Sequence, residues 1–165
     1  MRKTWSKKVP SLLLTLAAVG LMVSTACTRG KRTTCSYFVK MLGEPAEVTE
    51  ALRKVGELGC TTAFPKLEEL YATGSYREDV TRAVKFIISK AESNIDRMKT
   101  DVKTAESEEA AQKMRARTAE KEQELKEAND RAIKLLLTAL KTPATSVIAA
   151  SIFEEWKTSA AETAL

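Results

Sequence analysis

The chain has 165 residues, with 27 Lys and Arg against 22 Asp and Glu, and it contains no histidine, so its formal net charge is +5. This length suits one small domain rather than two. Without histidine, the usual general base and the commonest metal ligand are both absent, and no nucleophile elbow or glycine-rich phosphate loop occurs. The composition therefore argues against an enzyme and predicts no metal and no cofactor.

A signal peptide is predicted over residues 1–26. Its first eight residues contain four basic side chains and no acid, the stretch from Leu12 to Val23 is apolar, and small residues then lead into Cys27. This order is typical of secretion signals, and the run is shorter than the roughly 20 apolar residues of a membrane-spanning helix. Because the signal holds four of the positive charges, its removal leaves a mature chain of about +1. A chain so near neutrality lacks the basic footprint of a nucleic-acid-binding protein.

The stretch Ser24-Thr25-Ala26-Cys27 resembles the cleavage box of bacterial lipoproteins. The resemblance implies that the thiol of Cys27 carries a diacylglycerol, that cleavage precedes it, and that acyl chains anchor the protein in the cell envelope. Thr28 is not the aspartate that retains some lipoproteins at the inner membrane, so the resemblance favours the periplasmic side of the outer membrane. Ordinary secretion and an uncleaved anchor helix are the alternatives.

Residues 27–43 are interpreted as a basic tether whose apolar end docks on the domain. If Cys27 is acylated, two cysteines remain, and Cys35 and Cys60 are predicted to form a disulfide, which persists in exported proteins. The alternative is a free thiol at Cys35 and a small buried side chain at Cys60. No Cys-x-x-Cys spacing indicates a metal site.

Residues 44–157 are predicted to form one helical domain. A helix opens at Glu44-Pro45 and stops at Gly59, a second begins at Thr62, and a third begins near Tyr76 after a small polar break. Apolar residues recur at helical spacing in each of them, and no alternation of period two competes. The fold class is therefore predicted to be all-α, with amphipathic helices packed in a layer.

The stretches Ala51–Gly59, Phe64–Leu70 and Asp79–Ala83 resemble HEAT-type repeats, with a weaker second match over Leu136–Leu140 and Pro143–Trp156. In that family a helix ending in Leu-Gly precedes a helix with proline, an acidic turn and an inner helix with a small alanine. The resemblance implies short stacked helix pairs and a concave surface that binds a protein. An unrelated helical bundle is the alternative.

Residues 91–131 form a charged helical extension that is rich in Ala, Glu, Lys, Arg and Gln, a composition that favours helix. Its apolar stripe is too thin for a sustained heptad. We therefore expect a hairpin that bends near Thr104–Glu108, with Ile95, Met98 and Val102 facing Met114, Ala119 and Leu125. One continuous helix is the alternative.

The C-terminal part regains apolar character. Residues 132–140 are strongly hydrophobic, a last helix is predicted from about Pro143 to Lys157, and residues 158–165 are expected to fray.

These features predict a lipid-anchored envelope adaptor that binds an unidentified envelope protein and contacts the membrane through the acyl chains on Cys27. Neither nucleic acid nor a small-molecule substrate is expected. The candidate partner surface consists of residue types enriched at binding hot spots, namely Tyr71, Tyr76, Arg82 and Trp156. The alternative is a structural spacer or self-associating lipoprotein that works through the charged hairpin.

Overall fold

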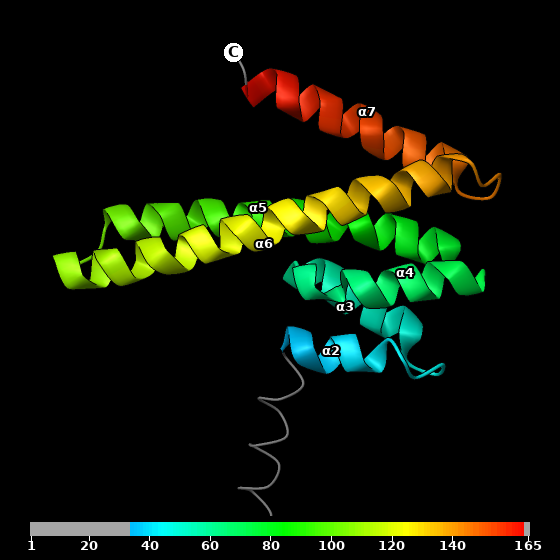
Figure 1. Cartoon of the computed structure of the whole chain (residues 1–165), viewed down its shortest axis with the longest axis horizontal. Helices are drawn as coiled ribbons and strands as arrows, with labels where there is room; N and C mark the ends of the chain where they lie inside the picture. The colour runs from blue at the N-terminus through cyan, green and yellow to red at the C-terminus, as the bar shows by residue number, and fades with distance from the viewer. Residues whose placement is uncertain (1–33, 164–165) are drawn as a thin grey trace, which may run out of the picture. The chain divides into compact units, whose positions relative to one another are not determined.

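Every regular element is helical in residues 34–163, the part of the chain that the computed structural model describes (Figure 1). The prediction of an all-α fold is therefore confirmed. The elements in chain order are α2 (Cys35–Met41), α3 (Val48–Leu58), the short 3-10 helix η1 (Thr61–Ala63), α4 (Phe64–Thr73), α5 (Arg77–Lys103), α6 (Glu108–Leu140) and α7 (Ser146–Thr163).

The helices from α2 to α7 pack in successive layers (Figure 1). Helix α2 packs on α3, α3 and α4 pack on the pair of α5 and α6, and α7 packs across that pair on its other side. The centre is formed by apolar side chains with almost no solvent exposure, which include Val55, Phe64, Leu67, Val84, Ile87 and Leu136. Each amphipathic helix thus buries its apolar stripe against a neighbour.

The end of α3 is closed by Gly59, as its sequence pattern predicts. Gly59 has a φ of 70°, and it donates its N–H to the carbonyl of Gly56 while Cys60 donates to Val55. A Cβ at Gly59 would lie 2.8 Å from the backbone nitrogen of Ala91 in α5. Glycine is therefore needed here both for the left-handed conformation and for the close approach of α5.

A disulfide between Cys35 and Cys60 joins the first residue of α2 to the residue after the α3 cap, with the two Cα atoms 5.4 Å apart. Helix α2 has only seven residues and none of them is fully buried. Helices shorter than about 12–15 residues are marginal alone, so the bridge and the buried Leu42 hold this helix on the domain. The described part of the predicted tether is thus mostly helical. Residues 27–33 lie outside the described part of the chain.

Helices α5 and α6 form the predicted charged hairpin. They have 27 and 33 residues, and the chain turns between Lys103 and Glu108. The hydroxyl of Ser107 caps α6 by accepting the N–H of Ala110 at 3.2 Å, which satisfies one of the free donors at a helix start. The turn between α5 and α6 therefore lies within Thr104–Glu108, where the sequence predicted the bend.

The predicted inner face of the second hairpin helix was partly wrong. Ala111 and Thr118 are buried against α5, whereas Met114 is 39% exposed and Ala119 lies on the exposed side. Small side chains allow α5 and α6 to approach each other closely, and the Thr118 hydroxyl is satisfied by donating to the carbonyl of Met114 at 2.8 Å. The buried face of this half of α6 is therefore marked by small side chains and not by the large apolar ones.

Helix α7 extends to Thr163, past Lys157, where the last helix was expected to end. The segment contains neither glycine nor proline after Ser146, so nothing in its backbone chemistry stops the helix earlier. Residues 164 and 165, the end of the predicted tail, lie outside the described chain. Within residues 34–163 no helix is long and apolar enough to cross a membrane.

Candidate functional site

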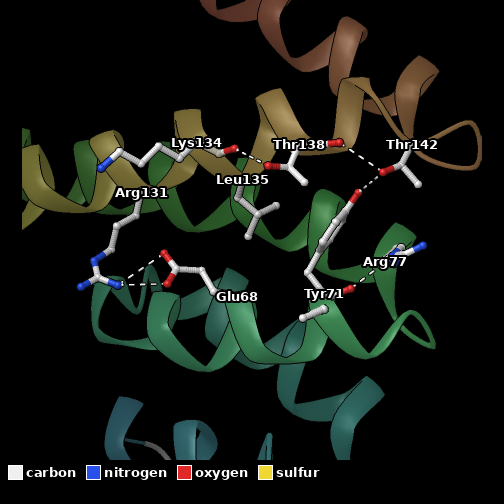
Figure 2. Close-up of a pocket in the computed structure, with 9 residues that line it drawn as sticks. Glu68, Tyr71, Arg77, Arg131, Lys134, Leu135, Thr138 and Thr142 are labelled. Atoms are coloured by element: carbon white, nitrogen blue, oxygen red, sulfur yellow. Dashed lines mark hydrogen bonds and ion pairs between the residues drawn. The ribbon is translucent and has the colours of Figure 1, made fainter.

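A cleft between α4 and α6 combines a large volume with charged walls (Figure 2). Its volume is about 640 Å³, and its lining consists of Glu68, Tyr71, Ala72, Arg77, Arg131, Lys134, Leu135, Thr138 and Thr142. Leu135 and the ring of Tyr71 supply apolar surface in the middle, and charged side chains lie at both ends (Figure 2). We call this site the α4–α6 cleft.

Tyr71 fixes the wall of the cleft on the α4 side. Its hydroxyl lies 3.1 Å from the Oγ1 of Thr142 and 3.0 Å from the Oγ1 of Thr145, and the Thr145 hydroxyl donates to the carbonyl of Ala139 at 2.9 Å. Tyr71 is only 6% exposed and Thr145 is fully buried. Buried polar groups that are satisfied in this way specify one arrangement of the helices, so Tyr71 ties α4 to the connection between α6 and α7.

One end of the cleft is cationic through Arg77. Its Nε donates to the carbonyl of Tyr71 at 3.2 Å, and its guanidinium carbon lies 5.5 Å from the centre of the Tyr71 ring. These contacts hold the planar guanidinium in place, and no carboxylate in the described part of the chain forms an ion pair with it. An arginine in this state retains donors for a bidentate contact with an anion.

The other end contains Arg131, Lys134 and Glu68. The Nη1 of Arg131 lies 3.3 and 3.2 Å from the two carboxylate oxygens of Glu68, in an exposed pair. Lys134 makes no ion pair with any described residue, and its side chain extends toward Arg131 (Figure 2). The lining as a whole therefore carries three cations and one carboxylate, and two of the cations, Arg77 and Lys134, have no carboxylate partner among the described residues.

This arrangement is suited to binding anions and offers little for acid–base chemistry. The cleft contains hydroxyl, guanidinium and ammonium donors around an apolar centre, which together match an acidic ligand with some apolar surface. In the described residues no group of three or more Cys, Asp or Glu side chains is arranged to hold a metal ion.

The predicted partner surface is distributed over several parts of the fold. Tyr71 lines the α4–α6 cleft, while Tyr76 is half-buried against the core. Arg82 lies on the outer side of α5, 3.4 Å from the carboxylate of Glu78, and lines a separate groove between α3 and α5. Trp156 packs on Phe153 in α7. The structure therefore does not bring these four residues together.

Sequence reasoning missed Arg131, Lys134 and Thr138, the cationic and hydroxyl wall of the cleft. They are spaced three and four apart along α6 and so share one face of that helix. In the sequence these three residues form a polar stripe on a helix that is otherwise strongly apolar over residues 132–140. Its meaning depends on α4 lying opposite, which no local pattern encodes.

The comparisons with known proteins give no relative. No family model, no curated protein and no solved structure matches this chain.

Proposed function

We propose that this chain is an exported lipoprotein, anchored in the bacterial cell envelope through acyl chains on Cys27, whose helical domain binds another envelope protein as an adaptor. The Cys35–Cys60 disulfide supports export, because such bonds persist in oxidising compartments and are rare in the cytosol. The chain has three cysteines, so this pairing leaves Cys27 as the one thiol to be acylated. Two or more acyl chains give stable anchoring.

The observation that carries the binding role is the α4–α6 cleft, where Arg77 and Lys134 have no carboxylate partner among the described residues. Unpaired cations beside an apolar floor favour an acidic segment of a protein partner. The outer-membrane location follows from the resemblance to lipoproteins alone. The HEAT-type resemblance adds an analogy of fold, in which stacked helices present a binding surface.

Photocrosslinking in intact cells tests this proposal. A photoreactive amino acid at Ala72, an exposed residue on the edge of the cleft, should give a discrete adduct with one envelope protein. The double variant Arg77→Gln/Lys134→Gln should reduce that adduct about tenfold or more, since each lost charge-assisted hydrogen bond contributes roughly 1.5–3 kcal/mol.

The matched control is Lys103→Gln/Lys113→Gln, which removes two exposed positive charges from the hairpin instead. It should leave the adduct unchanged. An adduct that weakens equally in both variants would indicate general charge attraction, and the absence of any adduct from Ala72 would contradict a partner at this cleft.

The structural spacer remains the second candidate, because the 33 residues of α6 span about 50 Å at 1.5 Å per residue. In this role the hairpin would reach away from the membrane or pair with copies of itself. A photoreactive amino acid at the exposed Met114 distinguishes the two. Crosslinks between copies through Met114, with none at Ala72, would favour the spacer.

A further inference from the structure

A second groove lies between the α5–α6 hairpin and the C-terminal half of α7, and it shares no residue with the α4–α6 cleft. Its volume is about 940 Å³, and its floor is made of Ile88, Ile95, Leu125, Ile133 and Trp156. Helix α7 diverges from α6 along its length, so this side of the hairpin is only partly covered (Figure 1). We call this site the α7 groove.

Helix α7, which contributes Trp156 to the floor of the α7 groove, is held in place by several contacts. Lys85 in α5 and Glu155 in α7 form an ion pair at 2.5 Å, and Ile152 is 2% exposed in the core. The ring of Trp156 packs edge to face on Phe153 with 6.1 Å between the ring centres. These contacts hold the ring in one place, so the groove is formed before any ligand binds.

Apolar surface remains uncovered on this floor. Ile133 is 41% exposed, and Trp156 and Leu125 are half-buried. Apolar area in a preformed groove favours a partner that buries it, because removing that area from water is favourable.

The rim of the groove is acidic. Four carboxylates and two ammonium groups surround the floor, namely Glu92, Asp96, Glu122, Asp130, Lys99 and Lys126. Lys99 pairs with Glu122 at 2.8 Å and also interacts electrostatically with Asp96, so the four carboxylates and two ammonium groups leave the rim with a net charge of −2. Burial and the neighbouring Asp96 raise the pKa of the Glu92 carboxyl above its ordinary value, as expected for a desolvated carboxyl beside another carboxylate.

We propose that the α7 groove binds a cationic amphipathic helix of a partner protein. An apolar stripe at positions i, i+3, i+4 and i+7 would lie on the floor, as in other complexes that seat a helix in a groove. Lysine or arginine side chains on both flanks would pair with the carboxylates of Glu92, Asp96 and Asp130. This surface is separate from the α4–α6 cleft, so the proposal stands if the cleft binds nothing.

Fluorescence of Trp156 gives a direct test. The chain has two tryptophans, Trp5 and Trp156. Trp5 lies in the predicted signal peptide, so mature protein that begins at Cys27, in non-ionic detergent, reports on the groove alone, and Trp5→Phe serves the same purpose where the signal stays attached. The probe is a helical peptide of about 16 residues, with leucine on one face and lysine on the flanks. A matched peptide has glutamate in place of lysine, and another keeps the lysines but scrambles the leucines.

The lysine peptide should shift the emission of Trp156 to the blue and bind at least tenfold more tightly than either matched peptide. Neutralising the rim with Glu92→Gln/Asp96→Asn/Asp130→Asn should weaken binding about tenfold, and Ile133→Ser should weaken it severalfold. The control Glu106→Gln/Glu109→Gln/Glu120→Gln removes three exposed carboxylates elsewhere on the hairpin and should have no effect.

Equal binding of the lysine and glutamate peptides would overturn the proposal, and so would a rim variant that binds as tightly as the control. The occupant could instead be a second copy of this chain. In that case the emission of Trp156 would change with protein concentration in the absence of peptide, and sedimentation would show dimers that Ile133→Ser disrupts. That result would overturn the assignment to a separate partner.

Discussion

Breaking the disulfide by Cys35→Ser should detach α2 and destabilise the domain. The bridge closes a loop with a sequence separation of 25 residues, for which the chain-entropy relation gives about 3.5 kcal/mol. Cys35 is the partner to change because it is only half-buried, whereas Cys60 is 1% exposed and its sulfur atom fills core space. The substitution thus removes the bridge without opening a cavity.

Urea unfolding followed by circular dichroism measures this effect. With a slope of roughly 1.5 kcal/mol per molar urea for a small domain, the unfolding midpoint should fall by about 2 M. Hydrogen exchange should also show that the amides of α2 lose protection before the rest, because this seven-residue helix buries no residue completely.

The native chain in reducing agent is the control and should match Cys35→Ser without reductant. A midpoint shift below roughly 0.3 M, equivalent to about 0.5 kcal/mol, would mean that the bridge does not stabilise the domain by restraining the unfolded chain. Alkylation of Cys35 and Cys60 in unreduced, denatured protein would show that no bridge exists.

Three further stability predictions follow from single side chains. Tyr71→Phe should lower the free energy of unfolding by about 1 kcal/mol, because the hydroxyl contacts are lost. The melting temperature should then fall by a few degrees, whereas Tyr76→Phe should leave it unchanged. In chemical denaturation, Gly59→Ala should lower the free energy of unfolding more than Gly74→Ala does. Both glycines have positive φ, where a Cβ alone costs about 1–2 kcal/mol. Of the two, only Gly59 would place that Cβ within 3 Å of backbone atoms. Glu92→Gln should raise the melting temperature at pH 7. Because the pKa of Glu92 is raised in the folded state, its ionisation opposes folding, and the difference from the native chain should vanish below about pH 4.

Local patterns in the sequence predicted most of the helical fold. The stop at Gly59, the break in the charged segment and the all-α class follow from glycine conformation, helix propensity and apolar spacing. These are properties of neighbouring residues, so one sequence suffices to find them. The pair of Cys35 and Cys60 also came from a simple count of cysteines once Cys27 was set aside.

The candidate site could not be predicted in the same way. The α4–α6 cleft depends on Tyr71 meeting Thr142 and Thr145, which are more than 70 residues away. Such contacts arise from how helices stack, and a degenerate apolar pattern does not encode them. The inner face of α6 was missed for a related reason, because close packing there uses Ala111 and Thr118 rather than large apolar side chains.

Mass spectrometry of the mature N-terminus shows whether acyl chains on Cys27 anchor the protein. We expect an N-terminal peptide that begins at Cys27 and carries a diacylglyceryl thioether, and Cys27→Ala should abolish both the modification and membrane attachment. A mature chain that begins at another residue, or one that contains an unmodified Cys27, would contradict lipid anchoring.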